Sequence, residues 1–350
     1  MTVTPSAPTD TLALVTNGRA RRAARRRLAL AILGTLIIVV FAVSLMVGQT
    51  FYPPNEVIGV ILGQDVPGAT FTVGRLRLPR AVLAVVAGLS FGLAGVTFQT
   101  MLRNPLASPD IIGISAGASA AASFAIITLS LSGTAVSIFA IVAGLGVALL
   151  VYGLSFKGGG AGTRLILVGI GIAAMLESLT NYVLSRAGQW DLQEALRWLT
   201  GSLNGTTWPQ VVTAAVALAI FAPLLLSKSG QLGAMQLGDD TAGALGVRVE
   251  RTRLTVIVAA VGLIAFATAA AGPIAFVAFL SGPIAARVVG PNGSLLLPAS
   301  FIGALLVLVA DLCGQYAFGT RFPVGVVTGV LGAPYLLYLI VRTNRAGSSL

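Results

Sequence analysis

Residues 19–47 read RARRAARRRLALAILGTLIIVVFAVSLMV: six arginines followed directly by twenty residues without a charge. An uncharged run of that length crosses the roughly 30 Å hydrocarbon core of a bilayer as an α-helix. The two parts together predict a membrane helix that begins at Leu28 and has a basic segment before it. A secretory signal peptide is the alternative, but its apolar run is usually about 7–15 residues long and ends in a small-residue cleavage site, which does not follow Val47 here.

The rest of the chain repeats this apolar pattern. Hydrophobic residues make up 56% of the sequence and charged residues 9%, and the mean hydropathy is +0.93, which is typical of a membrane protein. Apolar segments predict ten membrane helices, at residues 28–47, 81–102, 111–131, 135–156, 165–184, 208–227, 254–271, 273–289, 295–318 and 324–341. We therefore expect an all-α polytopic membrane protein with a disordered basic tail at residues 1–27, a single ten-helix domain at 28–342 and a short tail at 343–350.

Basic residues predict how these helices are oriented. With ten crossings, all but six of the 22 Lys and Arg residues lie on the side of the two termini. The six on the other side are Arg75, Arg77, Arg80, Arg186, Arg197 and Arg321. Because basic residues are retained on the cytoplasmic side, both termini and both tails are expected in the cytoplasm. An arginine-led apolar helix ending in Ala-Gly occurs at 80–95 and, in the opposite direction, at 253–272, which favours two inverted half-repeats.

Several kinds of chemistry are excluded by composition. The chain has no histidine and one cysteine, Cys313, so we expect no disulfide within the chain, no bound metal ion and no catalytic residues. Its arginines lie between apolar segments rather than among aromatic residues, so nucleic acid is not an expected partner. The glycine-rich segment 157–163 lacks the Gly-Lys-Ser/Thr ending of a phosphate-binding loop and is expected to be a flexible turn. If ATP drives transport, another polypeptide must bind it.

Three groups of residues are candidates for function. In the cytoplasmic loop at 237–247, Asp239 or Asp240 can cap a short helix and Gly246 can end it, so the loop is either a plain connector or a helix offered to a partner through an apolar face at Leu245. Arg77 and Arg80, on the outer side, suit either carboxylates of a docking protein or lipid headgroups. Within the spans, Glu177 would serve a proton-coupled secondary transporter, whereas Asp311 is expected to be a structural hydrogen-bonding group.

Seven motifs over residues 75–342 resemble the FecCD-type permeases of ABC importers, which carry iron-siderophore complexes, haem or vitamin B12. They are RLPR (77–80), RNPLASPD (103–110) with Gly113, LGDD (237–240) with Leu245-Gly246, AGPIAFV (271–277), AD (310–311), PVGVV (323–327) and LG (331–332). The segments GSLNG (201–205), GDDTA (238–242) and ADLC (310–313) with Gln315 are most similar to the ferric-enterobactin branch.

This resemblance implies the ten-helix fold of the vitamin B12 permease, in a subunit that moves ferric siderophore across the inner membrane by alternating access. It implies four kinds of partner: a second permease subunit, identical or paralogous; two cytoplasmic ATPase subunits that use ATP and Mg; an extracytoplasmic binding protein; and membrane lipid. No cofactor is expected on this chain.

The resemblance also assigns residues to roles. It places ATPase coupling at Gly238, Asp239, Asp240, Ala244, Leu245 and Gly246, and binding-protein docking at Arg77 and Arg80. Arg321 stands where many members have a glutamate, and we expect it to join the docking surface. Candidate residues of the translocation pathway are Ser178, Thr180, Asn181 and Tyr182. Gly282-Pro283 replaces a Pro-His or Pro-Gln pair of many members.

Overall fold

The computed structural model describes residues 8–155, 161–290 and 293–347, and within these ranges the chain is helical without a β-strand. Seven of the described helices are long and apolar enough to cross a membrane, and three shorter helices, at 114–127, 277–289 and 324–339, are apolar as well. Each of the ten predicted segments overlaps one of these helices, which confirms the all-α polytopic architecture.

The apolar helices are α1 (Pro8–Met46), α3 (Leu78–Met101), α4 (Ile114–Ile127), α5 (Thr134–Ser155), α6 (Ala161–Ser185), α8 (Trp208–Ser227), α11 (Val249–Ala271), α12 (Val277–Val289), α13 (Leu296–Tyr316) and α14 (Val324–Gly347). The connecting elements are α2 (Pro54–Ile61), the π-helix η1 (Thr70–Arg77), the 3₁₀-helix η2 (Pro109–Ile112), α7 (Gln189–Leu199), α9 (Ser229–Met235) and α10 (Asp239–Ala244). The sequence did not predict α7, because its polar residues give no membrane signal.

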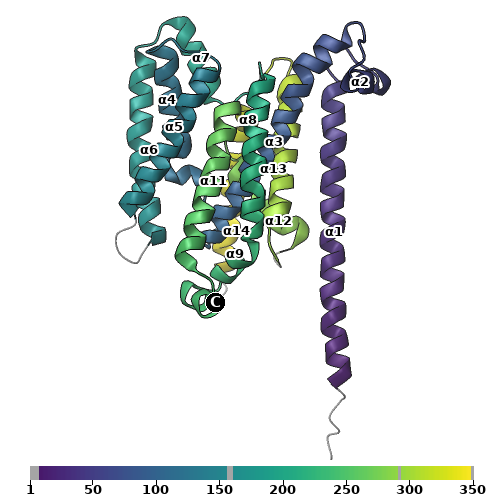
Figure 1. Ribbon diagram of the computed structural model, residues 1–350, viewed down its shortest axis with the longest axis vertical. Coiled ribbons are helices and arrows are strands. Elements are labelled where there is room, and N and C mark those ends of the chain that lie inside the picture. The colour runs from purple at the N-terminus through teal and green to yellow at the C-terminus, as the bar shows by residue number, and fades with distance from the viewer. Residues whose placement is uncertain (1–7, 156–160, 291–292, 348–350) are drawn as a thin grey trace, which may run out of the picture.

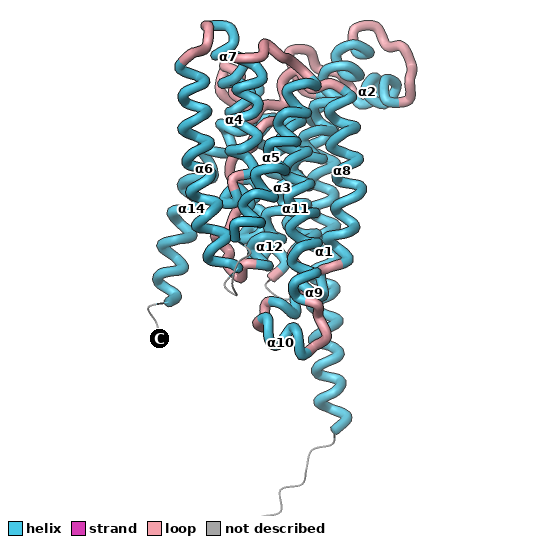
Figure 2. The backbone as a smooth tube through the Cα atoms, turned by 60° about the vertical axis from the view of Figure 1, so that its left-hand side comes forward, coloured by secondary structure: helices cyan, strands magenta, loops and turns pink. Residues whose placement is uncertain are grey.

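The two ends of the bundle differ in what they carry. The first turn of α1, the end of α14, α9 and α10 lie at one end, whereas α2 and α7 lie at the other (Figures 1 and 2). The first and last described residues, Pro8 and Gly347, therefore lie on the same side, as an even number of crossings requires. We call this side the cytoplasmic end, as the distribution of arginines predicts, and the opposite side the outer end.

Helix α1 is longer than the sequence predicted. Residues 1–27 were expected to be a disordered tail, but a single helix runs from Pro8 through the arginines to Met46, and residues 1–7 lie outside the described residues. The basic segment is rich in Ala, Arg and Leu, which favour helix, and it extends an existing helix without a new nucleation step. At the other terminus α14 likewise continues to Gly347. Residues 156–160 of the glycine-rich segment, together with 348–350, fall outside the described part of the chain.

Helix lengths reveal the two half-repeats. Helices α3, α4, α5 and α6 have 24, 14, 22 and 25 residues, and α11, α12, α13 and α14 have 23, 13, 21 and 24. Each short second helix begins beside a residue with positive φ, Gly113 at 78° and Phe276 at 63°. The first series starts at the outer end and the second at the cytoplasmic end (Figure 1). These features support the predicted inverted repeat.

Glycines let α3 cross α13 at very short range. A Cβ atom at Gly88 would lie 2.5 Å from the carbonyl oxygen of Gly303, and one at Gly92 would lie 2.3 Å from that of Ala299. At Gly95, a Cβ would lie 1.8 Å from the carbonyl oxygen of Ala278 on α12. Because lipid offers no hydrophobic force between helices, such small residues allow the close backbone contact that holds them together. Helix α3 is accordingly the most enclosed of the long apolar helices that the structure describes.

We predict that Gly92→Leu destabilises the protein, because the new side chain has no space between α3 and α13. Overpacking a tight core typically costs about 1–3 kcal/mol, so the midpoint of thermal unfolding in detergent should fall clearly. The matched control is Gly146→Leu on α5, where an added Cβ meets nothing within 4 Å. Equal midpoints for the two variants would contradict the proposed contact.

Candidate functional site

The loop predicted to hold a short helix forms α10, at the cytoplasmic end. Its last residues close as expected: Gly246 has φ +83°, and the amides of Gly246 and Val247 donate to the carbonyls of Gly243 and Ala242 at 2.9 and 3.0 Å. This pattern is a Schellman motif, in which glycine is favoured at the left-handed position. The start differs from expectation, because the N-cap is Gly238 and neither Asp239 nor Asp240 caps the helix.

Asp239 instead joins α10 to two long helices. Its carboxylate forms ion pairs with Arg253 of α11, at 2.6 Å, and with Arg103, which follows α3. Arg103 also donates from Nε to the carbonyl of Met235, at 2.8 Å, at the end of α9. Asp239 thereby links the cytoplasmic end of α3 to that of α11 through one carboxylate. We call Arg103, Asp239 and Arg253 the cytoplasmic clamp.

Arg103 occupies a position that disfavours side chains. Its φ is +52°, and the amides of Arg103 and Asn104 donate to Thr100 and Gln99, at 3.3 and 3.0 Å. A second Schellman motif thus ends α3, with arginine where glycine is usual. A non-glycine residue in this left-handed region is uncommon and points to a use for its side chain. That use is the pairing with Asp239.

The remaining face of α10 is open. Leu245 is 63% exposed and Leu237 is 66% exposed, and Ala244 and Asp240 are exposed as well. Ala242 is fully buried and holds the opposite face against the protein. An added Cβ at Gly243 or Gly246 would meet no atom within 4 Å. The helix therefore presents an apolar residue, Leu245, beyond the cytoplasmic end of the bundle.

A second ion pair joins α3 to α13 near the outer end. Arg80 at the start of α3 binds Asp311 of α13 through two hydrogen bonds, Nε–Oδ2 at 2.8 Å and Nη2–Oδ1 at 2.7 Å. Gln315 donates to the same carboxylate at 2.8 Å, and Arg80 also contacts the side-chain oxygen of Asn204. The side chains of Arg80 and Asp311 are only 15% and 7% exposed. Asp311 is thus the structural hydrogen-bonding group that the sequence predicted.

The three arginines predicted to dock a binding protein have different surroundings. Arg77 donates to the carbonyls of Leu45, Met46 and Thr50, at 2.9, 3.0 and 2.8 Å, and lies over the ring of Tyr52. Arg80 is paired within the chain, as described above. Arg321 is exposed at the outer end. The sequence did not predict these partners within the chain, because they are distant along it. Those of Arg77 lie 27–32 positions away, and Asp311 lies 231 positions from Arg80.

Two of the four predicted pathway residues line a cavity. Thr180 and Asn181, with Glu177, border a space of about 430 Å³ between α6, α4 and η2. The other polar residues on its wall are Asp110, Ser115 and Ser119. Ser178 and Tyr182 are not part of this wall: the Ser178 hydroxyl donates to the Ala174 carbonyl at 2.9 Å, and Tyr182 lies under Arg186. Asp110 belongs to the RNPLASPD motif, but the sequence did not predict that it lines the same cavity as Glu177, because the two residues are far apart along the chain.

A larger cavity lies beside α7 at the outer end. It measures about 560 Å³ and has polar walls that include Glu194 and Arg197 of α7 and Asn204 of the following loop. The loop is fixed on both sides, because Ser202 donates its amide to Ala271 at 2.8 Å and Gly201 accepts from Gly325 at 3.1 Å. Among the described residues, no group of three or more His, Cys, Asp or Glu residues is arranged to hold a metal ion.

Known proteins match almost the whole chain. The model of the FecCD transport family matches residues 36–342. The ferric enterobactin transport system permease protein FepG of Escherichia coli K12 is 38% identical, over 85% of this chain and 91% of its own length. The achromobactin transport system permease protein CbrC of Dickeya dadantii is 37% identical, over 91% and 92%.

A solved structure is similar as well. It is an inward-facing conformation of a metal-chelate-type ABC transporter, with a TM-score of 0.80 and 28% identity, covering 89% of this chain and 98% of that one. The similarity therefore extends to the arrangement of the helices in space.

The outer ion pair predicts a large effect of Asp311→Asn. Removing one partner of a buried pair leaves the other charge uncompensated, which costs roughly 3–5 kcal/mol, so the thermal midpoint should fall strongly. Replacing both residues, Arg80→Met with Asp311→Leu, should destabilise much less than Asp311→Asn alone. Arg75→Gln, at an exposed arginine of the same segment, is the control. A shift in Asp311→Asn no larger than the control's would show that the pair is unimportant.

Proposed function

This chain belongs to the FecCD transport family, and from that premise we propose that it is the permease subunit of an ABC importer that carries ferric siderophore across the inner membrane. The observation that carries the proposal is α10, a short helix joined by ion pairs to both half-repeats and exposed at the cytoplasmic end, within a fold similar to that of a metal-chelate ABC transporter. An exposed helix of this kind offers a binding surface to a separate ATPase subunit.

Relatives support iron chelate as the cargo. The names of three of them, 36–38% identical to this chain, refer to ferric enterobactin, Fe(3+)-citrate and iron(3+)-hydroxamate. A cobalamin import permease of Halobacterium salinarum is 32% identical over 78% of the chain, so the fold alone does not select the cargo. A proton-coupled carrier that uses Glu177 finds no support among these relatives.

We infer the path of coupling from the clamp. One of the two ATPase subunits, which use ATP and Mg, binds the exposed face of α10 through Leu245 with Asp240, Ala244 and the flanking Gly238 and Gly246, and the other binds the second permease subunit. When they close, α10 pulls on Arg103 and Arg253 through Asp239. Because α3 is locked to α13 by glycine contacts, the pull moves both half-repeats together. The pathway beside α6 then opens to one side of the membrane at a time.

The pathway itself needs a second permease subunit, identical or paralogous. Large apolar side chains on α6 and α14 are exposed, among them Met175, Leu179, Leu331 and Leu337, and we assign these faces to the subunit interface. Thr180 and Asn181, with Ser178 and Tyr182 on other sides of α6, supply weak hydrogen-bonding contacts to a bulky chelate. On the outer side, the extracytoplasmic binding protein docks on Arg321, with Arg77 and Arg80 holding the helices beneath it.

Reconstitution tests the proposed function. The permease, its ATPase and its binding protein are placed in proteoliposomes, and uptake of iron-55 siderophore is measured. We expect uptake only with ATP on the cytoplasmic side, and none when the ATPase carries an inactive nucleotide site. Uptake driven by a proton gradient without the ATPase would overturn the proposal in favour of the Glu177 carrier.

Substitutions in the exposed face of α10 and in the cytoplasmic clamp should have different effects. Leu245→Asp should abolish ATPase association, measured by co-purification, because it puts a charge on the exposed apolar face. Arg253→Gln should leave association intact but lower the ratio of chelate transported to ATP hydrolysed by up to about fivefold, since a partly exposed ion pair is worth up to about 1 kcal/mol. Arg251→Gln, an exposed arginine two positions away, is the matched control. If Arg253→Gln and Arg251→Gln transport with the same ratio, the clamp does not transmit the motion.

A further inference from the structure

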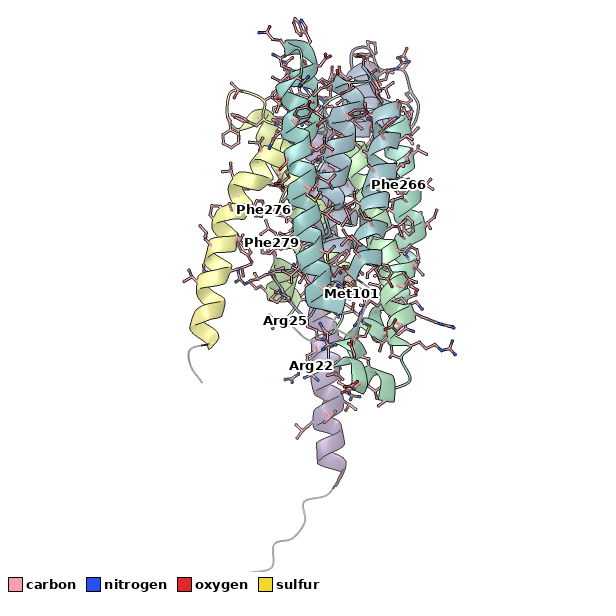
Figure 3. The ribbon with its side chains drawn as sticks, turned by 90° about the vertical axis from the view of Figure 1, so that its left-hand side faces the viewer. Arg22, Arg25, Met101, Phe266, Phe276 and Phe279 are labelled. Atoms are coloured by element: carbon pink, nitrogen blue, oxygen red, sulfur yellow. The ribbon has the colours of Figure 1, made fainter. Side chains whose placement is uncertain are left out.

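Helix α1 carries a dense group of arginines that the proposed transport mechanism does not use. Arg19, Arg21, Arg22, Arg25, Arg26 and Arg27, which we call the arginine collar, lie directly before the uncharged run that begins at Leu28. Nine helical residues span about 13 Å along the axis, and the headgroup layer of one leaflet is about 5–8 Å deep. Arginine side chains are long enough to reach back to that layer. The collar is therefore within reach of the headgroups of the cytoplasmic leaflet, and Figure 3 shows Arg22 and Arg25 at the cytoplasmic end of the bundle.

The collar surrounds the helix rather than forming one basic face. Positions three, four and seven apart share a side of a helix, so Arg19, Arg22 and Arg26 lie on one side and Arg21 and Arg25 on another. Five of the six side chains are exposed. Arg26 alone is partly buried, where it contacts the carbonyl of Ser294 before α13. A protein partner approaching from one side would engage only part of this ring, whereas lipid headgroups reach every open side.

Among the described residues, no ion pair involves the collar. The sequence contains no Asp or Glu between Asp10 and Glu56, and the ion pairs found among the described residues, at Arg80, Arg103 and Arg253, lie elsewhere. The apolar part of α1 beyond the collar is only 11% buried against the rest of the chain, so the other described helices leave most of its surface open. Guanidinium groups pair with phosphate through two parallel hydrogen bonds.

We propose that the arginine collar binds the anionic phospholipid headgroups of the cytoplasmic leaflet around α1. Clusters of four to eight basic residues next to a membrane helix are attracted to anionic lipid, with a contribution from each residue near the surface. The bound lipids hold α1 at the edge of the bundle, where Gly34 packs against Phe301 of α13 and Arg26 contacts the loop before it. The proposal rests on the insertion of α1 with its first turn in the cytoplasm and is independent of the cargo.

Native mass spectrometry of the full-length protein provides the test. The purified permease is titrated with phosphatidylglycerol or phosphatidylcholine, and the bound lipids are counted. Wild type should prefer phosphatidylglycerol, and the double variant Arg21→Gln with Arg25→Gln should lose that preference by roughly tenfold. Arg21→Lys with Arg25→Lys should retain most of it. Only two arginines are replaced, so that four remain to keep the first helix in its orientation.

A charge-matched control tests whether the lipid preference depends on the collar or only on the net charge of the protein. Arg248→Gln with Arg251→Gln removes the same charge from exposed positions at the start of α11, and its preference should equal that of wild type. Equal loss in this control would show that net charge alone attracts the lipid and would overturn the proposal. A Gln variant that keeps its phosphatidylglycerol preference but no longer co-purifies with its ATPase would also overturn it, because the collar would then be a protein interface.

Discussion

The close crossing of α3 and α13 is the constraint on which the rest of the structure depends. At Gly88 and Gly92 the backbones approach so closely that a single added carbon would overlap a carbonyl of the other helix. In a bilayer there is little hydrophobic gain from bringing helices together, so contact between backbones has to supply the attraction. One helix from each half-repeat takes part, and the crossing therefore fixes how the two halves are interlocked.

Helix α3 connects the two surfaces of the membrane through charges at its ends. Arg80 binds Asp311 at the outer end and Arg103 binds Asp239 at the cytoplasmic end. The outer pair is buried, so an arrangement that separates it leaves each charge without its partner, whereas the cytoplasmic pair is partly exposed and contributes less. The two pairs join α3 to α13 at one end and to α10 at the other.

Local reasoning predicted the parts of the candidate site that depend on neighbouring residues. The short helix at 239–244 followed from a glycine that ends it and from polar residues that start it, although Gly238 rather than an aspartate is its N-cap. Its two arginine partners could not be predicted in this way, because Arg103 lies 136 positions from Asp239 and Arg253 lies 14 positions away on another helix. Arg80 shows the same difficulty, because the carboxylate that it binds lies 231 positions away on another helix of the same chain.

By itself the sequence determined that the chain is an all-α polytopic membrane protein, and it predicted ten crossings with both ends in the cytoplasm, because hydropathy and arginine placement act on each segment separately. The motifs along it also indicated the family. Only the tertiary structure decided that α1 continues as a helix through its arginines, that α4 and α12 are short, and which carboxylate each arginine binds. Those features arise from contacts between segments far apart in the chain, and no spacing along the sequence records such contacts.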